Sequence, residues 1–179
     1  MTFANFGYGA TTNRILAQHA EVTTAALYHY FESKLTLYCE VYDEAQERIY
    51  ARFQSAIADL PGFLDRFEAV LEAAHEINSE DPSLARFVGA ARVDMVRYQE
   101  VGLATRPANE RFSFFLHLVD DAVKRGEVAK TDRAAVVVLL RTVLIGLTDA
   151  VSQSDAEHRL AVDAFRSIFE GKALIKRVV

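Results

Sequence analysis

The stretch ATTNRILAQHAEVTTAALYHYFESKLTL, Ala10 to Leu37, decides the fold of this chain. It predicts two short helices joined by a tight turn and followed by the start of a longer helix. A hydroxyl side chain stands at each start, where it can accept a hydrogen bond from a free backbone N–H of the first turn. These hydroxyls belong to Thr11 or Thr12, to Thr23 or Thr24, and to Ser33. Two short helices with only a few residues between them are typical of a DNA-binding helix-turn-helix.

Helical spacing divides each short segment into an apolar and a polar side. In the first segment Ile15 and Leu16 recur at core spacing. In the second, the predicted helix covers Ala25 to Phe31 and places Tyr28 and His29 outward. The apolar stripe of that helix is predicted to hold Ala26, Leu27, Tyr30 and Phe31.

The same residues resemble the TetR/AcrR family of bacterial one-component regulators. Its helix-turn-helix commonly has the pattern T-T-x-x-x-I-A-x-x-A-G-V-S-x-G-x-L-Y-x-Y-F-x-S-K-x-x-L. The resemblance covers Phe3 to Leu37 at motif level and the rest of the chain only by length and helical pattern. It implies an all-α fold with an N-terminal helix-turn-helix DNA-binding domain, residues 1–42, and a C-terminal helical ligand-binding and dimerisation bundle, residues 43–179.

Two departures from the family pattern lie in the helix-turn-helix itself. Glu21 stands where the family usually has a turn glycine, so its backbone is expected in a shape that a side chain disfavours by about 1 kcal/mol. Ala25 replaces another small residue, often glycine, and keeps the DNA-facing surface flat.

A third departure concerns the first helix of the family domain. Only MTFAN precedes Phe6, Gly7, Tyr8 and Gly9, so most of that helix and the basic arm before it are expected to be missing. Its loss would expose core side chains worth roughly 1.5 to 3 kcal/mol each when buried. Two explanations stay open: a start codon placed too late, or a damaged DNA-binding half. The side chains concerned are Ile15, Leu16, Val22, Leu27 and Phe31.

The resemblance also implies which side chains contact a double-stranded DNA operator. Arg14 is placed to bond a guanine in bidentate fashion, which contributes about 1 to 3 kcal/mol of discrimination. Phosphate contacts are expected from hydroxyls, an ammonium and helix N-termini. Tyr30 is a further phosphate candidate, with core packing as the favoured alternative. The predicted DNA-binding set is Thr12, Arg14, Thr23, Thr24, Ala25, Tyr28, His29 and Lys34.

Composition limits the classes of protein to which the chain can belong. With 179 residues, 51% hydrophobic residues, 3 prolines and 8 glycines, it is long and apolar enough for a sizeable folded core. No apolar run approaches the roughly 20 residues that span a bilayer, and the start lacks signal-peptide character, which predicts a cytoplasmic protein with no membrane contact. The single Cys39 is expected to be a buried thiol. The net charge of −5 requires DNA affinity to come from a local basic surface.

The remaining chain predicts a series of amphipathic helices and no strand. Pro61 and Gly62 end a long helix that starts at Ser33, and Pro82 starts another that Gly102 closes. The further predicted helices are Phe63 to Ile77, a helix from the Arg106–Pro107 start to Val123, Ala134 to Leu147, and Leu160 to Phe169.

The segment from Arg133 to Ser152 is so apolar that it must be buried on nearly all sides. In the resemblance, the last two helices pair with their copies in a four-helix homodimer interface. A buried core helix within one subunit is the alternative. A dimer would require a palindromic operator, because the DNA half-sites follow the two-fold axis of the protein.

Aromatic side chains on the middle helices predict a cavity for a small, largely apolar effector. The alternative is that they are simply core residues. The predicted ligand-binding set is Phe63, Phe67, Phe87, Arg92, Met95, Tyr98, Phe112 and Phe115.

These observations favour a ligand-responsive repressor that a small molecule releases from its operator. The alternative is a dimeric helical small-molecule-binding protein whose incomplete DNA-binding half is inactive. No cofactor, metal or catalytic residue is predicted, because the chain has no Gly-rich phosphate loop and no nucleophile elbow. Glu72-x-x-His75 has metal-ligand spacing, but a second Glu-x-x-His is missing, so a surface glutamate near a structural histidine is favoured.

Overall fold

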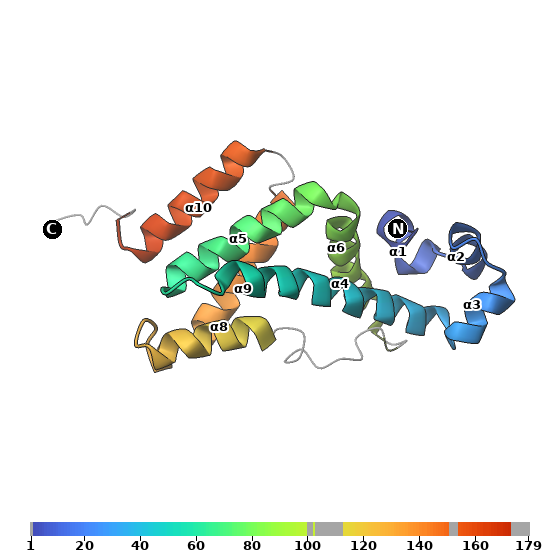
Figure 1. Ribbon diagram of the computed structural model, residues 1–179, viewed down its shortest axis with the longest axis horizontal. Coiled ribbons are helices and arrows are strands. Elements are labelled where there is room, and N and C mark those ends of the chain that lie inside the picture. The colour runs from blue at the N-terminus through green and yellow to red at the C-terminus, as the bar shows by residue number, and fades with distance from the viewer. Residues whose placement is uncertain (1, 100–101, 103–112, 151–153, 173–179) are drawn as a thin grey trace. The chain divides into compact units, whose positions relative to one another are not determined.

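A computed structural model describes residues 2–99, 102, 113–150 and 154–172, and the regular structure in these residues is entirely helical (Figure 1). The predicted all-α fold is confirmed. Packing divides the chain into two compact units: Met1–Ala51 with Ile77–Arg111, and Arg52–Glu76 with Phe112–Val179. The predicted functional domains, residues 1–42 and 43–179, stay a prediction, since this packing groups later residues with the helix-turn-helix.

The first unit is built around the helix-turn-helix. Helix α1 packs against α2 and α6, and α2 packs against α3. The bounds are α1 Thr2–Ala10, α2 Asn13–His19, α3 Thr24–Tyr30, α4 Lys34–Ile57 and α6 Pro82–Arg97. Residues of α4 up to Ala51 and all of α6 belong to this unit.

Although α1 is short, it still packs side chains into the core of the first unit. Phe3 is buried, and its ring lies 4.7 Å from that of Tyr38 and 6.2 Å from that of Phe87. Leu16 and Leu27 are buried as well, so the prediction that they become exposed was wrong. Among the side chains named for exposure, Val22 is the exposed one, while Ile15 and Phe31 are half-buried.

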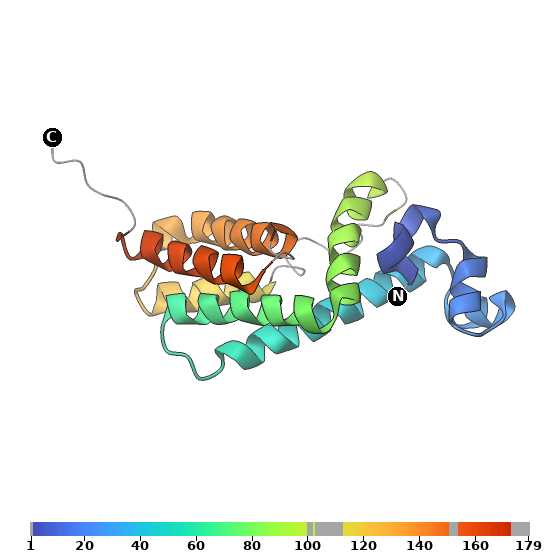
Figure 2. The ribbon, with the colours of Figure 1, turned by 90° about the horizontal axis from the view of Figure 1, so that it is seen from above.

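The second unit is a bundle in which α8 packs against α9. Figure 2 shows α8, α9 and α10 running alongside α5. The bounds are α5 Phe63–Glu80, α8 Ser113–Lys124, the 3-10 turn η2 Lys130–Asp132, α9 Arg133–Ala150 and α10 Asp155–Phe169. Residues of α5 up to Glu76 belong to this unit.

Local sequence signals explain where these helices begin and end. Pro82 begins α6, and the Asp81 side chain before it accepts a hydrogen bond from the Leu84 N–H at 3.0 Å. Helix α6 ends at Arg97, earlier than the predicted stop at Gly102. The predicted start at Arg106 and Pro107 lies outside the described residues.

Helix α9 differs from expectation in one respect. Leu140 and Val137 are buried, but Val138 is 59% exposed and Leu139 also faces outward. A single chain therefore buries only part of the apolar surface of α9, and burial on nearly all sides stays a prediction that depends on the homodimer.

Candidate nucleic-acid interface and small-molecule pocket

Threonine hydroxyls close the N-termini of both short helices. Thr12 Oγ1 accepts a hydrogen bond from the Ile15 N–H at 3.3 Å, and Thr23 Oγ1 accepts one from the Ala26 N–H at 3.0 Å. Both threonines have extended backbones, as N-cap residues do. The predicted start signals are thus confirmed, and the phosphate contacts of the same hydroxyls stay a prediction.

The turn between α2 and α3 adopts the backbone shape expected from the family's glycine position. Glu21 has a φ of 55°, in the left-handed region that favours glycine. The Val22 N–H donates to the Ala17 carbonyl at 3.0 Å, which closes the turn. A side chain in this conformation costs about 1 kcal/mol relative to glycine.

The outer side of α2 and α3 carries most of the predicted DNA-binding set. Thr24, Ala25 and His29 of α3 and Arg14 of α2 are all exposed. Tyr28 is exposed as well, and its hydroxyl accepts a hydrogen bond from the Asn13 side-chain amide. This bond joins the two helices at their surface and fixes the direction in which Tyr28 extends.

Tyr30 does not pack into the core, where its spacing had placed it. Its side chain is 79% exposed. Helix α3 ends at Tyr30, and the backbone of Phe31 is extended, so Phe31 turns toward the core and leaves Tyr30 outside. Because its side chain is exposed, Tyr30 is accessible for a phosphate contact, which was the other predicted role of this residue.

Lys34 has a structural role that the sequence pattern did not indicate. Its Nζ donates hydrogen bonds to the carbonyl oxygens of Tyr8 and Thr11, each at 2.8 Å, and lies 4.2 Å from the centre of the Tyr8 ring. Burial lowers the pKa of Lys34, and the nearby Asp94 carboxylate opposes that shift. The ammonium therefore holds the segment between α1 and α2 against the start of α4.

A buried carboxylate completes the same arrangement. Asp94 of α6 is only 6% exposed, and its Oδ2 accepts hydrogen bonds from the Tyr8 N–H at 2.7 Å and from the Tyr38 hydroxyl at 2.9 Å. Burial, together with the hydrogen bond to Asp94, raises the pKa of Tyr38. We call Asp94, Tyr8, Tyr38 and Lys34 the Asp94 cluster. It joins α1, α4 and α6.

Two glycines allow the chain to pass this close to α6. Gly7 has a φ of 66°, and a Cβ atom there would lie 3.3 Å from Asp94 Oδ2. A Cβ atom on Gly9 would collide with the Tyr98 hydroxyl oxygen unless the tyrosine moved. The sequence signal for the cluster is the Gly-Tyr-Gly element together with an aspartate at a core position of an amphipathic helix.

The predicted ligand-binding residues fall into both compact units. Phe87, Arg92, Met95 and Tyr98 belong to the first, and Phe63, Phe67 and Phe115 to the second. Phe87 packs against Tyr38, and the Tyr98 ring lies 5.3 Å from that of Tyr8, so both contact the Asp94 cluster. Phe112 lies outside the described residues. Their role in binding an effector stays a prediction.

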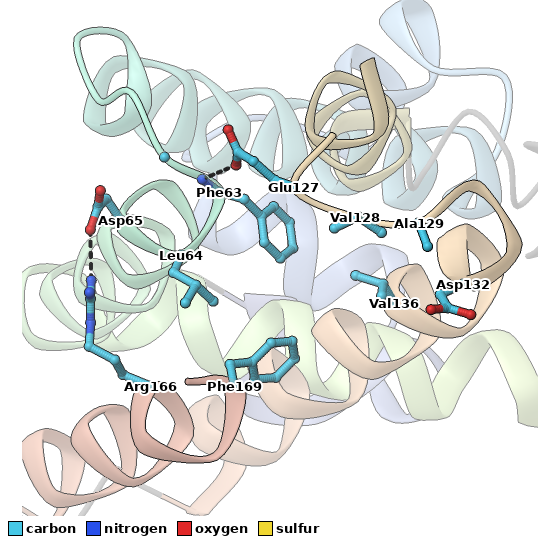
Figure 3. A pocket seen from close by; sticks show the side chains of 11 residues that line it. Phe63, Leu64, Asp65, Glu127, Val128, Ala129, Asp132, Val136, Arg166 and Phe169 are labelled. Carbon is cyan, nitrogen blue, oxygen red and sulfur yellow. Dashed lines mark hydrogen bonds and ion pairs between the residues drawn. The ribbon is translucent and has the colours of Figure 1, made fainter. Parts of the chain in front are cut away.

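Within the second unit, a pocket of about 600 Å³ opens at the end of the bundle (Figure 3). Phe63 is the member of the predicted ligand-binding set that lines it. The Phe63 N–H donates to Glu127 Oε2 at 2.6 Å, which ties the start of α5 to the segment after α8. The pocket is lined by Gly62, Phe63, Leu64, Asp65, Glu127, Val128, Ala129, Asp132, Val136, Arg166 and Phe169.

The histidine of Glu72-x-x-His75 stacks on a second histidine. The rings of His75 and His158 lie 4.2 Å apart and are inclined by 14°. His75 Nε2 lies 3.0 Å from Asp155 Oδ1, and His158 Nε2 lies 3.6 Å from Glu72 Oε1. The in-plane lone pairs of stacked rings point in parallel directions and do not converge on one ion. In the described part of the chain, no three histidine, cysteine or carboxylate side chains form a metal site.

Comparison with known proteins identifies the N-terminal segment. Residues 1–41 match the family model of bacterial regulatory proteins of the tetR family. Over this segment the chain matches the tetR-family helix-turn-helix, and the match supports a DNA-binding transcriptional regulator. No curated protein matches it.

Solved structures share the fold over nearly all of the chain, and some of them are regulators of the tetR family. Salmonella enterica GusR is 22% identical with a TM-score of 0.76, and the alignment covers 96% of this chain and 88% of that one. A tetR-family regulatory protein from Rhodococcus RHA1 is 18% identical with a TM-score of 0.66, covering 98% and 93%. A TetR-family regulator from Pectobacterium atrosepticum is 21% identical with a TM-score of 0.65, covering 98% and 90%. Among the described residues of this chain, no helix has the length and apolar character needed to cross a membrane.

Proposed function

We propose that this TetR-family regulator is a cytoplasmic repressor that binds a palindromic operator as a homodimer and leaves it when a small molecule binds. The observation that carries this proposal is the Asp94 cluster, in which a buried carboxylate of α6 holds the backbone just before the helix-turn-helix. A shift of α6 would move the hydrogen-bond acceptor of the Tyr8 N–H. The position of α2 and α3 therefore depends on that of a helix outside the motif.

The homodimer is supported by apolar side chains that a single chain leaves in water. Val138 of α9 and Leu160 and Ile168 of α10 are 59%, 69% and 56% exposed. Leu160 and Ile168 are eight residues apart, which places them on one face of α10. Exposed apolar patches of this kind mark protein interfaces, and two-fold symmetry lets one patch cover its copy.

DNA recognition is assigned to the exposed side of the helix-turn-helix. Arg14 would pair with a guanine, with Thr24, Ala25, Tyr28 and His29 on the remaining base edges. Thr12 and Thr23 stand at helix N-termini, where backbone N–H groups and the helix dipole favour phosphate. Lys34 would contact phosphate with the part of its ammonium that the Tyr8 and Thr11 carbonyls leave available.

Release by an effector requires a ligand that binds more tightly to one arrangement of the two helix-turn-helix motifs than to the other. A coupling of 1 to 3 kcal/mol changes operator affinity roughly 5- to 150-fold. Members of the predicted ligand-binding set remain the candidates for contacts with this ligand. A ligand that binds without changing operator affinity would contradict this part of the proposal.

Fluorescence anisotropy with DNA from the region upstream of this protein's own gene tests the assignment. The wild-type chain should bind tightly at low salt and more weakly as salt rises, because lysines and arginines displace counterions from phosphates. Arg14→Ala should weaken specific binding roughly tenfold or more. Arg86→Ala, which removes the same charge from an exposed position on α6, should have little effect.

Two results would separate the alternatives. Equal losses for Arg14→Ala and Arg86→Ala would remove Arg14 from base recognition. Absence of salt-sensitive specific binding to the upstream DNA and to a pool of random operators would favour the dimeric ligand-binding protein without DNA activity.

The dimer is tested by sedimentation. Leu160→Glu should convert the dimer to a monomer, because it places a charge in the centre of the proposed interface. Val96→Glu is the matched control, since Val96 is equally apolar and exposed but lies on α6. If both variants keep the wild-type oligomeric state, the interface does not include α10.

A further inference from the structure

The pocket at the end of the second unit has walls that the fold holds in place (Figure 3). Arg166 of α10 pairs with Asp65 at 2.8 Å and with Glu68, both on α5. On the other side, Glu127 accepts the Phe63 N–H and pairs with Arg125 at 2.6 Å. Charge-assisted hydrogen bonds thus join α5 to α10 and to the segment after α8, so the cavity is formed without a ligand.

The interior of this pocket is apolar. The rings of Phe63 and Phe169 face it, together with Leu64 and the valines Val128 and Val136. A volume of about 600 Å³ is within the range of sites that hold small organic molecules. An aromatic or aliphatic body would therefore gain free energy by leaving water here.

The charged side chains around the pocket are mostly carboxylates, which favour a cationic ligand over an anionic one. Figure 3 shows Asp65 and Asp132 on opposite sides, with the Phe63 and Phe169 rings between them. Arg166 is the basic side chain of the lining, and Asp65, Glu68 and Glu170 surround its guanidinium. Hydrogen bonds to Glu68 and Asp65 raise the pKa of Arg166, and these partners leave it little capacity to bind an added anion.

Asp132 differs from the other carboxylates of the lining. Asp65 and Glu127 each pair with an arginine, whereas the described residues supply Asp132 only with the Thr131 hydroxyl at 3.2 Å. Asp132 is exposed and stands immediately before α9. A ligand with an ammonium group would give this carboxylate the cationic partner that the described residues do not provide.

We infer that this pocket binds small amphipathic amines, with the apolar body against Phe63 and Phe169 and the ammonium at Asp132. The inference is independent of whether such a ligand releases DNA. It differs from the predicted aromatic cavity in place and in chemistry, because that set shares only Phe63 with this lining.

Isothermal titration with three matched probes tests this inference on the full chain without DNA. The probes are 4-phenylbutylamine, 4-phenylbutanol and 4-phenylbutyrate, which share one body and differ in the head group. The amine should bind saturably and most tightly, the alcohol about fivefold more weakly, and the carboxylate least of all. Raising the salt concentration should weaken binding of the amine but not of the alcohol.

Two variants place the site on the molecule. Asp132→Asn should reduce amine affinity about fivefold and bring it to that of the alcohol. Asp163→Asn, an exposed position on α10 that does not line the pocket, should leave all three affinities unchanged. Val136→Trp should abolish binding of every probe by filling the cavity, and thermal unfolding of each variant confirms that it is folded.

The inference is overturned if amine and alcohol bind equally, if the carboxylate binds most tightly, or if the amine shows no saturable binding. It is also overturned if Asp132→Asn and Asp163→Asn have the same affinities.

Discussion

Two buried polar side chains, one in each compact unit of this chain, differ in how their hydrogen bonds are satisfied. In the first, Asp94 is buried with two donors on its Oδ2, the Tyr8 N–H and the Tyr38 hydroxyl. In the second, His158 is 3% exposed, and its Nε2 has no hydrogen-bond partner among the described residues. The carboxylate oxygen Oε1 of Glu72 lies 3.6 Å from it.

This difference separates a buried group that stabilises from one that costs stability. A buried carboxylate with its hydrogen bonds made gains from the low dielectric around it, and removing it leaves the donors unpaired. A buried ring nitrogen without a partner has lost its hydrogen bonds to water and has gained none in the protein, which costs free energy. We therefore expect substitutions at Asp94 to destabilise and substitutions at His158 to be tolerated.

The largest effect is expected for Asp94→Ala. The substitution leaves the Tyr8 N–H and the Tyr38 hydroxyl buried without an acceptor, so the free energy of unfolding should fall by about 3 kcal/mol. Urea unfolding followed by circular dichroism measures it. Asp163→Ala, at an exposed position, is the control and should change stability by less than about 0.5 kcal/mol. If Asp94→Ala lowers the free energy of unfolding by less than about 1 kcal/mol, the proposed difference between buried Asp94 and buried His158 is wrong.

Lys34→Met tests whether the Asp94 cluster or phosphate is the main partner of the ammonium. Losing two hydrogen bonds to carbonyl oxygens should lower the free energy of unfolding by about 2 kcal/mol. If Lys34 mainly contacts phosphate, stability will be unchanged, and the salt dependence of operator binding will drop by about one charge. Unfolding and anisotropy on the same variant separate the two roles.

The pH dependence of stability tests the second unit. Burial, with a contribution from His75, lowers the pKa of His158 below its ordinary value of 6.5. The unfolded chain therefore binds the proton more readily than the folded one. Stability should be complete above pH 6.5 and should fall below it by at most about 1.4 kcal/mol per pH unit, until the folded-state pKa is reached.

His158→Phe should remove this acid sensitivity, because a phenyl ring can stack on His75 without binding a proton. Glu72 and Asp155 face the pair, as does Arg159, which disfavours a charged His158. Unfolding measured at pH 7 and pH 5.5 provides the readout. If the variant keeps the same pH dependence of stability, other titratable groups are its cause.

The smallest effect is expected for Glu21→Gly. Glycine relieves the strain of a φ of 55°, but it also gains freedom in the unfolded chain, so stability should rise by about 0.5 kcal/mol. Glu32→Gly, where no positive φ is present, should not stabilise. A destabilised Glu21→Gly variant would mean that the Glu21 side chain contributes more than its backbone costs.

Features that depend on residues a few positions apart were predictable. The threonine caps at Thr12 and Thr23 and the break at Pro61 and Gly62 follow from local rules, whereas the left-handed Glu21 was implied by the glycine position of the family pattern. Tyr30 shows the limit of periodicity, since a two-turn helix that ends at the residue itself does not set the direction of its side chain.

The sequence by itself therefore determined the all-α class, the order of the helices and the helix-turn-helix, because capping and 3.6-residue periodicity act within one or two turns. Only the tertiary structure decided which polar side chains meet. Asp94 lies 56 residues from Tyr38 and 86 from Tyr8, and Arg166 lies 98 from Glu68. Helical phase shows which face of a helix is apolar, but a partner this far along the chain depends on how whole helices pack.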